Sequence, residues 1–313
     1  MNKKMIAALI ALILAVPTTS QAVTSKPVNF KAEIKPATLA ILDTALDTSL
    51  PIFQGKVIYE VCILEWPSCP NKKNFMEGPG SAVVSPVAFT KSGFEHGTQV
   101  VYAAIKENPN IQILFVRIVP QNNNYDVQIT TQATFYNALN WVYSNKDKFN
   151  IKAISISQGS TSMLIAGTEY CPKTQQTRDS ITNLLSAGIP TFTAAGNNRY
   201  SDKVVWPACI PQAITIGAGT ENGIAIYSNN DSKVMDFFAN GNMQVYTVGN
   251  KQVNVAGTSY SAPTAAADWI ALFQAKPYLT YQQQYDLFVK TSIQIKGSQG
   301  TGKLMLLNGA LNG

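Results

Sequence analysis

The sequence contains little of what metal and redox sites are built from. Its 313 residues include one histidine and four cysteines, and charged residues make up only 13%. A single imidazole excludes mechanisms that need two, among them most zinc hydrolase sites. The cysteines lack paired CxxC spacing, and no dense Asp-x-Asp loop of the calcium type occurs. We therefore expect neither a required metal nor a cofactor.

Apolar runs long enough to span a membrane are absent as well. The run from Met5 to Val16 is too short, at about 1.5 Å per residue, to cross a hydrocarbon core of about 30 Å. Two lysines precede this run and a small-residue ending follows it, which is the pattern of a secretory signal peptide cleaved after Ala22. We expect residues 1–22 to be removed and residues 23–313 to be secreted or periplasmic.

Basic clusters are also missing. The net charge is +6, but the lysines and arginines are scattered, and no basic stretch is interleaved with aromatic side chains. We therefore expect no nucleic-acid partner.

The four cysteines of an exported chain predict two disulfides, which could pair in three ways. Cys62 and Cys69 enclose a short segment that contains Pro67, and this favours a local pairing. Cys171 and Cys209 would then form the second disulfide.

Apolar runs typical of buried strands alternate with segments of helical periodicity. We expect strands at residues 39–42, 57–64, 111–119, 153–156, 190–194 and 213–218, and helices after the histidine and at 131–144, 176–187, 261–274 and 281–290. This alternation predicts an α/β fold with a mainly parallel sheet. No Pro/Ser-rich linker, charge block or repeat divides residues 23–313, so we expect one domain.

Four short stretches carry side chains that could do chemistry. Asp43 follows an apolar strand, and Asn197 ends another in Ala-Ala-Gly-Asn. His96 lies between two glycines ahead of an apolar helical pattern. Ser259 and Ser261 lie at the start of an apolar helix, where unpaired backbone N–H groups favour negative charge. Each has a structural explanation too, because aspartate and asparagine suit turns, serines cap helices and a lone histidine is usually structural.

Taken together, in the order Asp43, His96, Asn197 and Ser259, these stretches resemble the motifs of the subtilisin-like serine proteases. That family typically shows Asp-Thr-Gly, His-Gly-Thr-His, Ala-Ala-Gly-Asn and Gly-Thr-Ser-Met-Ala-Ser-Pro. This chain has Asp-Thr-Ala, His-Gly-Thr-Gln, Ala-Ala-Gly-Asn and Gly-Thr-Ser-Tyr-Ser-Ala-Pro. The likeness covers nearly all of residues 36–313 and implies a three-layer α/β/α fold around a mainly parallel sheet.

The resemblance also implies roles for these residues. Ser259 would be the nucleophile, His96 the general base and Asp43 the group that orients the imidazole. Asn197 and the Ser259 backbone N–H would bind the oxyanion. Ser261 would support the start of the helix.

The same resemblance implies a peptide or protein substrate. Ser157, Gln158 and Gly159 would bind it by strand addition, through backbone hydrogen bonds that tolerate many sequences. Val205 falls where the family often has glycine at the base of the main specificity pocket, so we expect a shallower pocket that favours small or medium apolar residues. We therefore expect the protein to be an exported, monomeric endopeptidase. The alternative is an exported protease-like binding protein with little or no activity.

Some positions depart from the family pattern. Ala45 replaces a glycine and could strain the backbone. Gln99 replaces the second histidine, and Tyr260 replaces an oxidisable methionine, so we expect activity to survive peroxide. Residues 57–90 look like an added, cysteine-bearing segment, whose Glu60 and Glu65 compete with Asp43 as the carboxylate of the site.

Overall fold

The computed structural model describes residues 36–313, apart from 91–92, 123, 125, 128–129, 166–170 and 172–174. The expected signal peptide and its cleavage point lie outside the described residues. In the described part of the chain, no helix combines the length and the apolar character that crossing a membrane requires.

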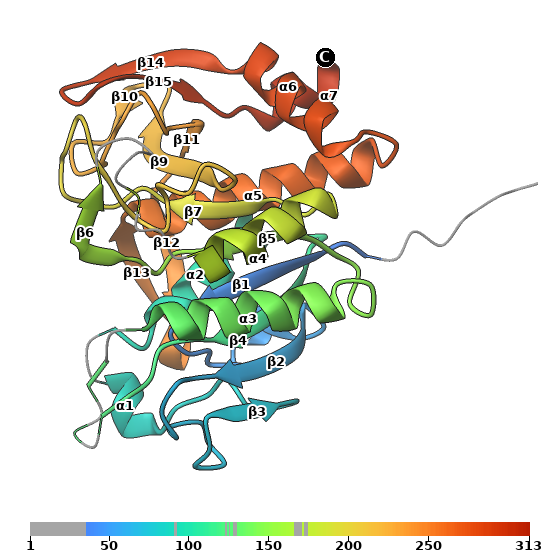
Figure 1. Cartoon of the computed structure of the whole chain (residues 1–313), viewed down its shortest axis with the longest axis vertical. Helices are drawn as coiled ribbons and strands as arrows, with labels where there is room; N and C mark the ends of the chain where they lie inside the picture. Colours follow the sequence, from blue (N-terminus) through green and yellow to red (C-terminus); the bar gives the residue numbers. More distant parts are fainter. Residues whose placement is uncertain are drawn as a thin grey trace, which may run out of the picture. The chain divides into compact units, whose positions relative to one another are not determined.

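A mainly parallel sheet of eleven strands organises the fold (Figure 1). Its strand order is β14-β15-β11-β9-β7-β5-β1-β4-β2-β3, with β10 paired to β9. The strands are β1 (Thr38–Asp43), β2 (Val57–Ile63), β3 (Phe75–Glu77), β4 (Gln112–Arg117), β5 (Ile151–Ile156), β7 (Thr191–Ala194), β9 (Ile214–Thr220), β10 (Gly223–Ile224), β11 (Phe237–Ala239), β14 (Ile293–Gly297) and β15 (Gly300–Leu304). The pairings from β2 through β15 are parallel, and β3, β10 and β14 pair antiparallel.

The remaining elements are two antiparallel ribbons and the helices. The ribbons are β6 (Ser160–Ile165) with β8 (Val204–Trp206), and β12 (Asn242–Thr247) with β13 (Lys251–Ala256). The helices are α1 (Pro86–Thr90), α2 (His96–Glu107), α3 (Gln132–Asn145), α4 (Gln175–Ser186), α5 (Thr258–Ala275), α6 (Tyr281–Thr291) and α7 (Leu307–Asn312), with short 3₁₀ turns at Pro51–Phe53 and Val248–Asn250.

The central strand β1 shows how the layers form. Its side chains are all buried and point alternately to the two faces of the sheet, because successive residues of a strand face opposite sides. Leu39 and Ile41 join a core with apolar residues of α2 and α5, whereas Ala40 and Leu42 join a second core with residues of α3 and α4. The predicted three-layer α/β/α fold is therefore confirmed, and Figure 1 shows α3 and α4 lying over one face of the sheet.

The segment expected to be an insertion, residues 57–90, divides into two parts. Val57–Ile63 is β2, which pairs parallel to β4 in the main sheet, so this part is not an addition. The remainder contains β3 and the loop that the Cys62–Cys69 disulfide closes. The second predicted disulfide, Cys171–Cys209, is also present.

The helix after the serine motif begins earlier than expected. It starts at Thr258 rather than Ser261, and its cap residue is Gly257, with no side-chain hydrogen bond at the cap. The expectation that Ser261 supports the helix start is therefore wrong, because Ser261 lies inside the helix. Its hydroxyl is fully buried and has no hydrogen-bond partner among the described residues.

Candidate active site

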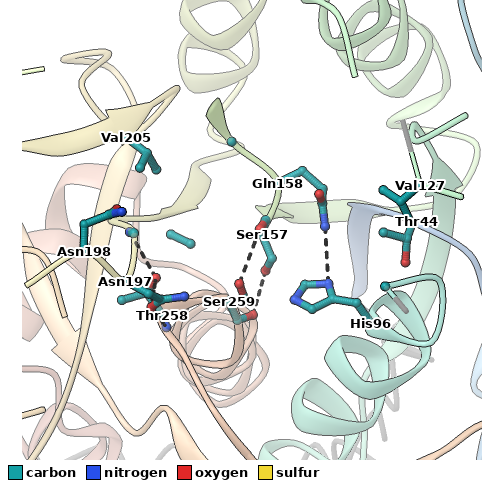
Figure 2. Close-up of a pocket in the computed structure, with 14 residues that line it drawn as sticks. Thr44, His96, Val127, Ser157, Gln158, Asn197, Asn198, Val205, Thr258 and Ser259 are labelled. Carbon is teal, nitrogen blue, oxygen red and sulfur yellow. Dashed lines mark hydrogen bonds between the residues drawn. The ribbon is translucent and has the colours of Figure 1, made fainter. Parts of the chain in front are cut away.

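The ends of β1, β5 and β7 and the starts of α2 and α5 meet at one edge of the sheet. β1 ends at Asp43, and α2 begins at His96. The chain continues from β7 to Asn197, and α5 begins one residue before Ser259. Carboxyl ends of parallel strands share one edge of an open α/β sheet, and ligands bind in the crevice there. A cavity of about 330 Å³ lies at this edge, lined by His96, Asn197 and Ser259 among others (Figure 2).

The buried carboxylate of Asp43 holds the imidazole. Asp43 is fully buried, and its Oδ1 lies 2.8 Å from His96 Nδ1 and accepts a hydrogen bond of 2.7 Å from the Thr44 backbone N–H. Because an ionised carboxylate only accepts hydrogen bonds, the Nδ1 of His96 must carry the proton. The other ring nitrogen is then unprotonated in the neutral ring, and Figure 2 shows it directed towards Ser259.

The surroundings of His96 set its basicity. Burial lowers the pKa of the imidazole, but the charge and hydrogen bond of Asp43, together with the charge of Glu95, outweigh burial and leave the pKa above its ordinary value. His96 is therefore a stronger base than a free histidine.

A proline in α5 leaves one carbonyl at the start of the helix available to the segment that follows β5. In an α-helix the carbonyl of Ser259 would accept from the N–H four residues later, but that residue is Pro263, which has no N–H. The Ser157 hydroxyl donates to the Ser259 carbonyl instead, at 2.7 Å. The Ser259 hydroxyl itself makes only a long contact of 3.5 Å with the Ser157 carbonyl. The backbone of Ser259 is thus held by a hydrogen bond, whereas its hydroxyl oxygen interacts only weakly.

The orientation of the Asn197 amide follows from its partners. Its Oδ1 accepts from the backbone N–H of Thr258 at 2.9 Å and lies 3.1 Å from the Thr258 hydroxyl, which accepts from the Gly196 N–H at 3.0 Å. Since these contacts use the amide oxygen, Nδ2 remains as a donor on the pocket side. Thr258 is a residue that sequence reasoning missed; its place between Gly257 and Ser259 in the serine motif was the available signal.

The residues expected to bind substrate line the same cavity. Ser157, Gln158, Gly159 and Val205 all border it. A Cβ added to Gly159 would lie 3.1 Å from one methyl of Val205, and a Cβ added to Gly196 would lie 2.7 Å from the other. Val205 therefore fills the space between these two segments, and no larger residue than glycine would fit at either position without movement.

Two departures from the family pattern contact each other. The Tyr260 hydroxyl donates to Gln99 Oε1 at 2.7 Å, and Gln99 Nε2 donates to the Thr247 hydroxyl at 3.1 Å. Tyr260 and Gln99 are both buried, and the ring centroids of Tyr260 and His96 are 5.7 Å apart. The substitutions at 99 and 260 thus form one unit that joins α2 to α5 behind the imidazole.

The expected strain at Ala45 is absent. Ala45 is not among the residues with positive φ, so its backbone does not need glycine. The tight contact lies at Gly97 instead, where an added Cβ would come within 2.5 Å of the Ala45 carbonyl oxygen. Glycine at 97 therefore allows α2 to approach the end of β1 and bring His96 to Asp43.

Glu60 and Glu65, the alternatives to Asp43 as the carboxylate of the site, have other surroundings. Glu60 accepts from the backbone N–H groups of Gly80 and Ala82, at 2.9 and 3.2 Å, and so holds the loop after β3. Glu65 is exposed. Asp43 is the carboxylate that hydrogen-bonds the imidazole. In the described ranges, no group of three or more His, Cys, Asp or Glu side chains is placed to hold a metal ion.

Comparisons with known proteins show the family of the chain. The profile of the subtilase family, peptidase S8, matches residues 35–307. Subtilisin-like protease 2 of Arthroderma otae is 29% identical over 177 residues, which is 55% of this chain and 39% of that protein. A subtilisin-like protease of Coccidioides posadasii (strain C735) is 26% identical over 229 residues, 72% of this chain and 49% of its own length. The chain thus spans half or less of the length of these curated relatives.

Solved structures show the same fold at low sequence identity. A cold adapted subtilisin-like serine proteinase superposes with a TM-score of 0.62 at 19% identity, covering 86% of this chain and 87% of its own. The prenylagaramide maturation protease PagA superposes with a TM-score of 0.66 at 16% identity, covering 89% of this chain and 93% of its own.

Proposed function

This chain belongs to the subtilase family, and from that premise we propose that it is an exported serine endopeptidase that cleaves peptide bonds through Asp43, His96 and Ser259. The observation that carries the proposal is the 2.8 Å contact between the buried Asp43 and His96, which lines the same cavity as Ser259. A serine hydroxyl is a poor nucleophile at neutral pH, so it needs an adjacent base. His96 is the one imidazole in the chain.

The proposed reaction has two halves. In the first, Ser259 Oγ attacks the carbonyl carbon of the substrate while His96 Nε2 takes the hydroxyl proton. The same nitrogen then gives that proton to the leaving amine, and an acyl-enzyme remains. In the second half, His96 takes a proton from water, which attacks the acyl carbon, and Ser259 leaves with the proton restored. Asp43 keeps Nδ1 protonated and stabilises the imidazolium in both halves.

Charge on the substrate oxygen would be met by two donors. Asn197 Nδ2 is left free because Thr258 occupies the amide oxygen. The Ser259 backbone N–H lies in the first turn of α5, where helix N–H groups lack partners within the helix. Such donors act on charge that appears only as the tetrahedral intermediate forms, so they lower the barrier rather than strengthen substrate binding.

Active-site labelling tests the proposal. A fluorophosphonate probe should form a covalent adduct on Ser259 in the wild-type protein, and Ser259→Ala should abolish both labelling and peptide hydrolysis. The expected loss in kcat is on the order of a million-fold, the size found on removing the nucleophile of a subtilisin. Ser261→Ala is the matched control, because Ser261 lies inside the helix and does not line the cavity.

The same experiment separates the two candidate functions. Folded wild-type protein that neither reacts with the probe nor cleaves peptides would support the protease-like binding protein. Export is proposed from the signal-peptide pattern, and the two disulfides are consistent with an oxidising compartment. N-terminal sequencing of the exported protein should show that processing follows Ala22.

A further inference from the structure

The side chain of Gln158 reaches the acid–base pair. Its Nε2 lies 3.0 Å from Asp43 Oδ1 and 3.3 Å from His96 Nδ1. Gln158 follows the end of β5 by two residues, and β5 is the neighbour of β1 in the sheet. Figure 2 shows the Gln158 amide directed from its own segment of the pocket wall towards the imidazole.

The chemistry of the three groups decides which contact is a hydrogen bond. Asp43 is acceptor-only when ionised, so the Gln158 atom facing it must be the NH₂ nitrogen rather than the oxygen. His96 Nδ1 already uses its proton for Asp43 and has no lone pair to offer. The Gln158 amide therefore donates to Asp43, and its 3.3 Å approach to Nδ1 places two N–H donors side by side.

All the hydrogen bonds to the Asp43 carboxylate that involve described residues are therefore made to one of its two oxygens. Oδ1 receives donors from Thr44, His96 and Gln158, at 2.7, 2.8 and 3.0 Å. Oδ2 is buried and has no hydrogen-bond partner among the described residues. Three donors sharing one oxygen fix the plane of the carboxylate. Those from Thr44 and Gln158 draw on the negative charge that would otherwise stabilise an imidazolium at His96.

We propose that Gln158 is a positioning residue, which holds the Asp43 carboxylate and keeps His96 in its neutral, proton-accepting form at lower pH than the Asp43 contact alone would allow. The catalytic role of Gln158 rests on the proposed function, but its hydrogen bond to Asp43 does not. The ionisable groups facing the imidazole are Asp43 from β1, Glu95 at the start of α2 and Tyr260 from α5. Asp43 and Glu95 both favour the imidazolium form of His96, and the Gln158 donor acts against this effect.

Gln158→Met tests the proposal, since methionine has a similar length and no N–H donor. The chain has one histidine, so an NMR titration of the imidazole carbon protons reports His96 without assignment. We expect the midpoint to rise by about 0.5 to 1 unit in the variant. The acidic limb of kcat/KM for a peptide substrate should rise by the same amount. Well below the midpoint, this corresponds to a loss of about 3- to 10-fold.

Gln282→Met is the matched control. Gln282 lies exposed on α6 and donates to Asp286 at 2.8 Å, an amide–carboxylate contact of the same kind away from the pocket. This control should leave the His96 midpoint where it is. Gln158→Glu is the second variant, because it replaces a donor by an acceptor and should raise the midpoint further than methionine does.

Several outcomes would overturn the proposal. An unchanged or lowered midpoint in folded Gln158→Met would do so, as would a rise in KM with no movement of the acidic limb, which would make Gln158 a substrate contact only. If Gln158→Met fails to fold, the same titration of Gln158→Leu decides, because leucine also lacks an N–H donor and adds no charge. The titration does not require turnover, so wild-type protein inert to a fluorophosphonate would refute the proposed function while the midpoints still test the Gln158 contact.

Discussion

The two sides of the active-site pocket differ in how many of their hydrogen-bonding groups are already engaged. On one side, a single oxygen of Asp43 accepts from Thr44, His96 and Gln158. On the other, the Asn197 amide nitrogen makes no hydrogen bond to a described residue, and the Ser259 hydroxyl has only a 3.5 Å contact. In the proposed mechanism, the first side stabilises a charge that is always present, and the donors of the second side remain unpaired until charge appears on the substrate oxygen.

Removing the permanent charge should have the largest effect on this comparison. Asp43→Asn keeps the size of the side chain but can present an N–H to the imidazole, which favours the wrong tautomer. We expect kcat to fall by about 10⁴-fold, with the fold retained. Asp47→Asn makes the same change four residues along the chain, where the carboxylate only holds Ser49 and Gly249, and should cost less than about 3-fold. Comparable losses in both variants would contradict the assignment.

Removing the reserved donor comes next. Asn197→Ala should lower kcat by about 100- to 1,000-fold, the range known for the equivalent donor of a subtilisin, with little change in KM. The reason is that Nδ2 meets charge only after attack has begun. Asn183→Ala, on the exposed face of α4, should change neither constant. A rise in KM that accounts for the whole loss would show that Asn197 binds the ground state instead.

Val205, which we expect at the floor of the pocket, should control which substrates can enter between the Asp43 side and the Asn197 side. The methyl groups of Val205 occupy the space that a Cβ at Gly159 or Gly196 would approach, so Val205→Gly would open space between these segments. We expect the wild-type protein to prefer alanine over phenylalanine before the scissile bond, and the variant to raise the phenylalanine-to-alanine ratio of kcat/KM by about 10-fold or more. An unchanged ratio, or a wild-type preference for arginine, would place the specificity pocket elsewhere.

The support behind the imidazole should affect stability more than chemistry. Tyr260→Phe removes the donor to Gln99 and leaves a buried amide oxygen without its partner, which costs about 1 to 3 kcal/mol. Urea unfolding measures this loss. Tyr278→Phe is the control, because Tyr278 is 75% exposed, and it should change the free energy of unfolding by less than about 0.5 kcal/mol.

The sequence was sufficient to predict the fold class because its apolar pattern follows the sheet closely. The apolar run at 39–42 became β1, and the run at 153–156 became part of β5, since strands buried on both faces tolerate few polar residues. The motif order also identified Asp43, His96, Asn197 and Ser259 as residues to examine. Their meeting at one sheet edge follows from strand ends that share a side of a parallel sheet.

The contacts that refine the site could not be predicted in this way. Gln99 and Tyr260 are 161 residues apart, and their hydrogen bond depends on the packing of α2 against α5. The reach of Gln158 to Asp43 depends on the register between β1 and β5 and on a side-chain rotamer. The missing N–H of Pro263 was visible in the sequence, but Ser157 as its substitute was not. Local pattern gives no information about such partners.

The pH dependence of Ser259 labelling would show most directly whether His96 activates the serine. In the proposed mechanism the neutral form of His96 is the base, so the rate of fluorophosphonate labelling should fall as pH drops below the pKa of the imidazole, by about tenfold per unit. Burial lowers that pKa, but Asp43 and Glu95 outweigh burial, so the fall should begin at a higher pH than it would for an unperturbed histidine. We expect the midpoint of labelling to coincide with the NMR midpoint of the sole histidine. Labelling of Ser259 that is insensitive to the ionisation of His96 would contradict it.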